Sequence, residues 1–109
     1  MQTVIKNARA VLADGVTDAR NVLVRDGVIA DLDYKGDLSE AFDAEGGYLL
    51  PGFVDIHVHG GGGADFMDAT PEAFECAVKA HAHHGTTTIY PTAMTAPEEQ
   101  LNAFIDAYL

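Results

Sequence analysis

The spacing of apolar and polar residues changes near residue 47, and the two parts predict different secondary structure. Residues 1–35 hold short apolar stretches with the two-residue period of half-buried strands. Asp14-Gly15 and Asp26-Gly27 separate these stretches, and Asp-Gly is typical of tight hairpin turns because both central positions need positive φ. The pattern therefore predicts a small antiparallel β unit over residues 1–35 and a connecting loop over residues 36–47.

The remaining residues predict the order strand, helix, strand, helix. Residues 53–59 and 86–90 are rich in apolar, β-branched and aromatic side chains, which favours strands. Thr70-Pro71-Glu72 predicts the start of the first helix, and Thr95-Ala96-Pro97-Glu98 predicts a capping box at the start of the second. Such alternation indicates a parallel sheet with right-handed crossovers.

Composition narrows the classes of function. The 109 residues carry a formal charge of −11, which repels nucleic-acid phosphates and anionic lipid, so we expect no nucleic-acid partner and no membrane partner. A single cysteine cannot form an internal disulfide. No apolar run approaches the roughly 20 residues of a membrane span, and the N-terminal residues lack a signal-peptide core. We therefore expect a cytoplasmic protein.

The length is small for a parallel α/β fold. Two parallel strands leave two open edges, and a parallel sheet normally needs helices on both faces or full closure. About 60 residues of strand and helix bury too little apolar surface to stand alone. The chain either associates extensively or forms the front part of a longer protein, and we favour the second interpretation.

Asp55-Ile56-His57-Val58-His59 is the segment with the clearest chemical pattern. In a strand, residues 55, 57 and 59 share one face, and the apolar residues 54, 56 and 58 share the face available for helix packing. Two imidazoles at this spacing on a strand can bind one metal ion at the roughly 2.0–2.1 Å bond lengths of zinc. His57 and His59 are therefore candidate metal ligands. Composition leaves the alternative open that they are hydrogen-bonded structural histidines.

His81-Ala82-His83 has the same spacing on the predicted first helix. Residues two apart on a helix point about 200° apart around its axis, so these imidazoles cannot bind one ion together. We expect His81, His83 and His84 to interact instead with the carbonyl end of the helix dipole. Spacing alone is therefore weak evidence, and the strand context distinguishes the first pair.

Three other features have structural interpretations. Residues 60–63 are glycines without the Lys and Ser/Thr of a phosphate-binding loop, which favours a mobile loop. Cys76 lies among apolar helical residues, which predicts a buried and unreactive thiol. Asp65 and Asp68 are interpreted as loop or helix-approach residues, with Asp65 close enough to the glycines to line the mouth of a site.

Residues 50–60 (LPGFVDIHVHG) resemble the first barrel strand of the amidohydrolase superfamily, metal-dependent hydrolases built on a (β/α)8 barrel. GGGADFMDA over residues 61–69, together with GTTTIYPT over residues 85–92, resembles the N-acetylglucosamine-6-phosphate deacetylases. The resemblance implies an α/β fold. Residues 1–50 would be the N-terminal part of a small β-sandwich, and residues 51–109 the first two βα units, or first quarter, of a truncated TIM barrel.

By this resemblance, His57 and His59 match the metal pair of the first barrel strand. They imply a divalent metal, zinc or iron, with one or two ions in the full-length enzyme. The implied reaction is metal-dependent hydrolysis of N-acetylglucosamine 6-phosphate to glucosamine 6-phosphate and acetate. The implied partners are this small amino-sugar phosphate and a second copy of the full-length enzyme, forming a homodimer.

The family's other metal ligands, its proton-shuttling aspartate and most of its substrate-binding groups would lie beyond Leu109. The resemblance therefore implies an N-terminal fragment without a catalytic residue of its own, and we expect the 109-residue chain to be inactive. Two alternatives remain. One is another amidohydrolase, a cyclic-amide hydrolase or base deaminase, which usually lacks the Asp-Phe-Met-Asp continuation. The other is a non-catalytic β/α module with structural histidines.

Overall fold

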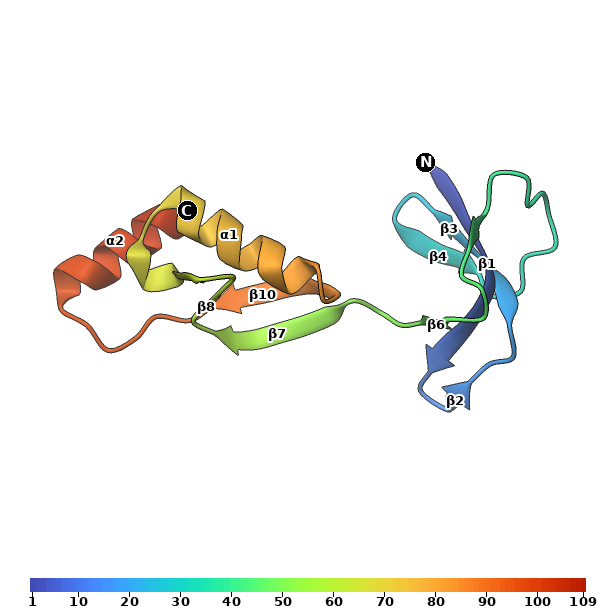
Figure 1. The fold of residues 1–109 in the computed structure, drawn as a ribbon, viewed down its shortest axis with the longest axis horizontal. Coiled ribbons are helices and arrows are strands. Elements are labelled where there is room, and N and C mark those ends of the chain that lie inside the picture. Colours follow the sequence, from blue (N-terminus) through green and yellow to red (C-terminus); the bar gives the residue numbers. More distant parts are fainter. The chain divides into compact units, whose positions relative to one another are not determined.

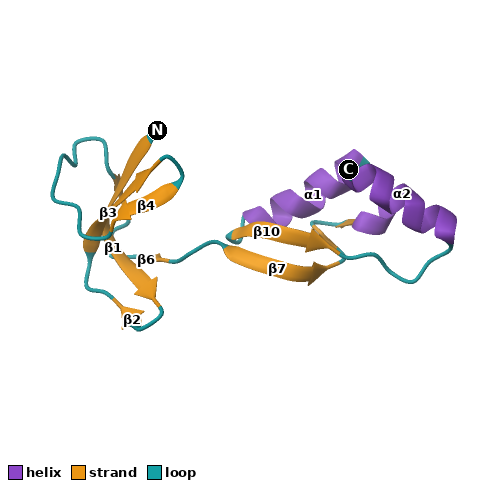
Figure 2. Ribbon diagram, turned by 180° about the vertical axis from the view of Figure 1, so that it is seen from behind, coloured by secondary structure: helices purple, strands orange, loops and turns teal.

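The computed structural model describes all of residues 1–109, which form two compact units, Met1–Pro51 and Gly52–Leu109 (Figures 1 and 2). The first unit consists of strands and loops, and the second contains both strands and helices. None of the helices combines the length and the apolar character that crossing a membrane requires.

The first unit is a β-sheet arranged around its longest strand, β1. Its strands are β1 (Gln2–Leu12), β2 (Gly15–Val16), β3 (Arg20–Arg25), β4 (Val28–Asp31), β5 (Phe42–Asp43) and β6 (Tyr48–Leu49). The pairs β1–β2, β1–β3 and β3–β4 are antiparallel, as the alternating pattern predicts. β5 and β6 pair parallel with β1. β5 lies within residues 36–47, so the prediction of a connecting loop there is wrong at Phe42–Asp43. Strands of two residues are too short for a periodic pattern to reveal.

The two Asp-Gly pairs behave differently. Asp26 (φ 52°) and Gly27 (φ 81°) form the turn between β3 and β4, so the predicted hairpin with two positive φ values is confirmed. In the hairpin between β1 and β2, Leu12 pairs with Gly15, which places the tip one residue earlier than predicted. Gly15 (φ 143°) is therefore the first paired residue of β2 rather than a central residue of the turn.

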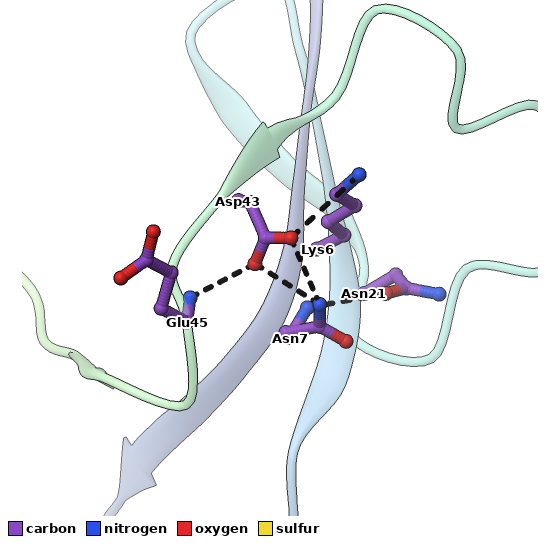
Figure 3. Close-up of polar contacts among 5 residues, drawn as sticks. All are labelled: Lys6, Asn7, Asn21, Asp43 and Glu45. Carbon is purple, nitrogen blue, oxygen red and sulfur yellow. Dashed lines mark hydrogen bonds and ion pairs between the residues drawn. The ribbon is translucent and has the colours of Figure 1, made fainter.

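A bulge at Asn7 (φ 55°) interrupts the register of β1 and brings together a polar cluster (Figure 3). Asn7 Nδ2 donates to both carboxylate oxygens of Asp43, at 3.0 and 3.2 Å. The same carboxylate accepts a hydrogen bond from the backbone N–H of Glu45 at 2.9 Å, and Lys6 Nζ lies 3.7 Å from it. The Glu45 N–H first, and then Asn7 and Lys6, hold the pKa of Asp43 below its ordinary value. The cluster thus ties β5 to β1.

The second unit contains two parallel strands, a helix along them and a second helix packed against the first (Figures 1 and 2). Its elements are β7 (Phe53–Val58), β8 (Gly60–Gly61), β9 (Ala64–Asp65), the 3-10 turn η1 (Phe66–Asp68), α1 (Pro71–Ala82), β10 (Thr86–Pro91) and α2 (Glu98–Tyr108). β7 and β10 pair in parallel, and α1, which connects them, runs along one face of the pair. The order strand, helix, strand, helix agrees with the sequence prediction, with β8, β9 and η1 added before α1.

The two helices begin in different ways. Thr70 Oγ1 accepts a hydrogen bond from Ala73 N–H at 3.2 Å, so the predicted start of α1 is confirmed. The capping box predicted at Thr95 for α2 is wrong, because the residue before the helix is Pro97 and no side chain caps this end. Pro97 is extended (φ −56°, ψ 151°), so the helix begins at Glu98, directly after the proline.

The core of the second unit is small. Val58, Phe66 and Ala77 are buried together, with Phe74, Ile89 and Phe104 packed against them. The apolar face predicted on β7 is covered at Val58 only, because Val54 and Ile56 are 60% and 76% exposed. The start of this apolar face is therefore exposed within residues 1–109.

Candidate metal centre

His57 and His59 project from the end of β7, on the strand and just after it, and their side chains converge. The two Nε2 atoms lie 3.2 Å apart, and the rings are close to perpendicular at 80°. Two nitrogens bound to one tetrahedral ion at the bond lengths of zinc are roughly 3.3–3.4 Å apart. The separation of these two atoms therefore fits a pair of ligands for a single ion.

A residue that the sequence analysis assigned no role fixes the orientation of His59. The Nδ1 atom of His59 lies 2.8 Å from the backbone carbonyl oxygen of Thr92, directly after β10. Thr92 follows the strand that pairs in parallel with β7, and the carboxyl ends of parallel strands meet at one edge of a sheet. The parallel pairing of β7 with β10 is therefore the feature from which a contact between Thr92 and the histidine pair could have been predicted.

Asp55, the carboxylate on the same predicted face, does not complete a metal site. Its Oδ1 accepts a hydrogen bond from His57 N–H at 3.1 Å, so the carboxylate bends back along its own strand. No group of three or more His, Cys, Asp or Glu side chains in residues 1–109 is arranged to hold a metal ion. This chain therefore presents two nitrogen ligands without a third protein ligand.

The histidines of α1 lie elsewhere. His81 Nε2 is 2.9 Å from the backbone carbonyl of Gly60, to which it donates, so it ties α1 to β8. His81 lies in the last turn of α1, as expected, and its hydrogen-bond partner is a carbonyl outside its own helix, which the sequence did not indicate. His83 and His84 are exposed at the end of α1.

The glycines after His59 form a tight hairpin instead of the predicted mobile loop. Gly60 pairs with Asp65 between β8 and β9, and the turn residues Gly62 and Gly63 have φ of 64° and 90°. A Cβ atom added to Gly61 would meet His81 Nε2 at 2.8 Å, so this strand needs glycine to approach α1 so closely. The glycine-rich run therefore has a packing role.

Asp65 and Asp68 cap the 3-10 turn η1. Asp65 Oδ1 accepts from Met67 N–H at 2.8 Å, and Asp68 Oδ2 accepts from Asp65 N–H at 3.0 Å. This reciprocal capping holds Phe66, which is fully buried, in the core. Both residues therefore act as helix-approach residues, as the sequence indicates. The hydrogen bond that Asp65 accepts from Met67 gives this side chain a structural role.

Cys76 is exposed, so the prediction of a buried thiol is wrong. The buried stripe of α1 runs through Ala73 and Ala77, and Cys76 lies beside it, where its Sγ donates to the carbonyl of Gly62 at 3.4 Å. The apolar character of the neighbouring residues did not reveal this offset, because the buried stripe of a short helix is narrow.

Comparison with known proteins identifies relatives of the chain. The chain matches no protein-family model. It is 33% identical over 103 residues to an N-acetylgalactosamine-6-phosphate deacetylase of Escherichia coli O157:H7, covering 94% of this chain and 27% of that protein. It is 32% identical over 97 residues to an N-acetylglucosamine-6-phosphate deacetylase of Lysinibacillus sphaericus, covering 87% and 25% respectively. The chain thus spans about a quarter of the length of these relatives.

Proteins named for the alternative activities also match. A dihydroorotase of Caldanaerobacter subterraneus is 43% identical, but over only 61 residues, which are 54% of this chain and 14% of that protein. The crystal structure of a D-hydantoinase superposes with a TM-score of 0.62 at 30% identity, covering 99% of this chain and 24% of that one. These matches do not support an alternative better than the deacetylases.

A solved deacetylase structure has a similar fold over almost the whole chain. The crystal structure of the N-acetylglucosamine-6-phosphate deacetylase from Pasteurella multocida superposes with a TM-score of 0.87 at 24% identity, covering 98% of this chain and 29% of that chain. The resemblance noted in residues 50–69 and 85–92 is thereby confirmed across the chain. In sequence and in fold, this chain is a relative of the N-acetylglucosamine- and N-acetylgalactosamine-6-phosphate deacetylases, which are hydrolytic enzymes.

Proposed function

We propose that these 109 residues form part of a metal-dependent deacetylase that hydrolyses N-acetylglucosamine 6-phosphate to glucosamine 6-phosphate and acetate. In this proposal His57 and His59 are two of the metal ligands. The observation that carries it is the 3.2 Å separation of their Nε2 atoms in a chain whose relatives are amino-sugar-phosphate deacetylases. The histidines alone do not choose between a glucosamine and a galactosamine substrate, and we favour the former because the resemblance in residues 61–69 is to that family.

The proposed fold assigns β7, α1, β10 and α2 to the first two βα units of a (β/α)8 barrel. The parallel pairing of β7 with β10 across α1 supports this assignment. We assign residues 1–50 to part of a small β-sandwich and residues 51–109 to the catalytic barrel. An open apolar groove in the first unit, lined by residues that include Val24, Ile29 and Leu50, is typical of a sheet that another layer covers.

The proposed chemistry assigns limited tasks to this chain. A divalent ion, zinc or iron, would supply Lewis-acid chemistry: it polarises an amide carbonyl and activates water for attack. His57 and His59 would hold such an ion through their Nε2 atoms, which the geometry of the pair fits. The number of ions, one or two, the homodimeric state of a full-length enzyme and its cytoplasmic location stay predictions.

The natural protein that carries these residues provides the test. We expect it to release acetate from N-acetylglucosamine 6-phosphate after loading with Zn²⁺ or Fe²⁺, and to turn over dihydroorotate and hydantoin at least about a hundredfold more slowly, since a site built for one substrate's polar groups rejects others strongly. A chelator should abolish the acetate release. Faster turnover of a cyclic amide would instead establish the alternative, and no turnover of any substrate would favour a non-catalytic module.

A further inference from the structure

Thr92 contacts the end of β7 with every polar group that it has. Its N–H donates to the carbonyl of Val58 at 2.8 Å, and its hydroxyl oxygen accepts from Val58 N–H at 3.2 Å. The hydroxyl in turn donates to the carbonyl of Tyr90 at 3.2 Å, and the Thr92 carbonyl accepts from His59 Nδ1 at 2.8 Å. Two of these hydrogen bonds hold residue 92 against Val58, the residue between the two histidines, and together the four bonds form a clamp around residue 92.

The clamp fixes the place of the Thr92 carbonyl relative to the imidazoles. Val58 is buried in the core, so its backbone is anchored from the opposite face of the strand. The Thr92 side chain bonds on one side to Val58 and on the other to Tyr90, and this connects the ends of β7 and β10. The carbonyl of residue 92 therefore meets His59 at a position that the side-chain hydroxyl helps to define.

The acceptor determines which nitrogen of His59 carries the proton. A neutral imidazole has one N–H donor and one lone pair, and a backbone carbonyl accepts but never donates. The contact between Nδ1 and the Thr92 carbonyl thus places the proton on Nδ1 and leaves the lone pair on Nε2. Nε2 is the atom that faces the Nε2 atom of His57. A metal ion binds through an unprotonated nitrogen, so this tautomer is the one ready for binding.

We propose that Thr92 is a positioning residue for His59: it holds the imidazole in the Nδ1–H tautomer and aims Nε2 at the metal position. This inference rests on the proposed function, because it gives the histidine pair its metal-binding role. Thr92 itself binds neither metal nor substrate in this proposal. Its hydroxyl acts through the backbone that it anchors.

Matched substitutions separate this role from general support of the fold. Thr92→Val keeps the β-branched shape and removes the hydroxyl, whereas Thr92→Ser keeps the hydroxyl and removes a methyl group. Thr88→Val is the control, because it replaces threonine by valine at an exposed position of β10. If loss of the hydroxyl is what matters, Thr92→Ser should match the wild type where Thr92→Val does not.

The test is a long-range ¹H–¹⁵N spectrum of the metal-free 109-residue chain labelled at histidine, recorded at mildly alkaline pH. We expect His59 to be protonated at Nδ1 in the wild type, in Thr92→Ser and in Thr88→Val, and to be a mixture of tautomers in Thr92→Val. Zn²⁺ titration followed by the same signals should show weakening of up to roughly tenfold in Thr92→Val only, because the carbonyl partner of His59 is then displaced rather than removed, and outright loss of a ligand's hydrogen-bond partner costs roughly 10–100-fold.

Several results would overturn the proposal. A wild-type His59 protonated at Nε2 would do so, as would a Thr92→Val chain with the wild-type tautomer and zinc affinity. If Thr92→Val does not fold by circular dichroism, the wild-type tautomer and the agreement of Thr92→Ser with it decide the question. Failure of the proposed function has a different signature: zinc binding that is unaffected by His57→Ala, in a wild-type chain whose His59 remains protonated at Nδ1.

Discussion

Two His-x-His segments of this chain have the same spacing and different structures. In β7, the two-residue period of the strand brings His57 and His59 to one side, with Nε2 atoms 3.2 Å apart. In α1, residues two apart point about 200° apart around the helix axis, and His81 bonds to Gly60 while His83 is exposed. The comparison teaches that the backbone, and not the spacing in sequence, makes a pair of histidines a candidate chelate.

The surroundings of the two pairs differ as well. His59 has a hydrogen-bond acceptor from the parallel neighbour of its strand, which orients the ring and leaves Nε2 unprotonated. His81 uses its Nε2 to join α1 to the glycine hairpin, so this nitrogen already has a structural partner. In one pair the Nε2 atoms therefore face each other, and in the other a ring nitrogen contributes a hydrogen bond to the fold.

The largest expected effect is the absence of deacetylase activity in the 109-residue chain, although it contains the strand pair. The 109-residue chain has two nitrogen ligands and no third protein ligand, so we expect acetate release from N-acetylglucosamine 6-phosphate to be no faster than in buffer. Loss of catalytic groups costs several orders of magnitude, about 10⁴ or more, in well-studied hydrolases. A coupled acetate assay with added Zn²⁺ measures this. Turnover by the purified chain would show that the strand pair is closer to a complete site than its geometry indicates.

Substitution of single histidines tests directly whether the strand pair and the helix pair differ in zinc binding. His57→Ala or His59→Ala should weaken Zn²⁺ binding by more than the roughly 10–100-fold that follows loss of a ligand's hydrogen-bond partner, because a ligand itself is removed. His83→Ala, an exposed histidine of the second segment, is the control and should bind as the wild type does. Competition with a chromophoric zinc indicator measures all three. Equal losses in all variants would mean that zinc binds without regard to the strand geometry.

The helix segment should affect stability instead. His81→Ala removes the hydrogen bond to Gly60 that joins α1 to β8, and we expect a loss of about 1 kcal/mol in the free energy of unfolding. Its zinc affinity should change less than that of His57→Ala. Urea unfolding followed by circular dichroism gives the stability. Unchanged stability in His81→Ala would remove the structural role assigned to this histidine.

The smallest effect is a pH dependence in the first unit, away from both histidine segments. The pKa of Asp43 is lowered from its ordinary value of 3.8, so the folded state favours its charged form. Its contribution is therefore present above that value and is lost as the pH falls through the lower pKa of the folded state. We expect Asp43→Asn to show less acid destabilisation below about pH 4 than the wild type. Thermal melts at neutral and acid pH test this, and identical acid sensitivity would contradict it.

The fold was predictable from the sequence where local chemistry determines it. Thr70 and Pro71 give α1 its start, and Asp26-Gly27 gives the hairpin its two positive φ values. The start of α2 was not predictable from the Thr95 pattern, because the backbone at Pro97 excludes the cap. The parallel pairing of β5 and β6 with β1 depends on contacts between distant residues, which local periodicity does not contain.

The candidate site also contains residues that were predictable from local pattern and residues that were not. The period of a strand was sufficient to place His57 and His59 on one face. Thr92 required knowledge that β10 pairs in parallel with β7 and that its end reaches Val58. The exposure of Cys76 likewise depends on which stripe of α1 meets the core. Residues that act through tertiary pairing were therefore the ones that sequence patterns missed.

One measurement tests the central claim, that the strand pair and not the helix pair binds a metal ion. The chain labelled with ¹⁵N at histidine is titrated with Zn²⁺, and all five histidines are followed in one spectrum. We expect the Nε2 signals of His57 and His59 to shift together with one apparent affinity, while the signals of His81 and His83 stay in place. Shifts at His81 or His83 with no change at His57 and His59 would contradict the claim.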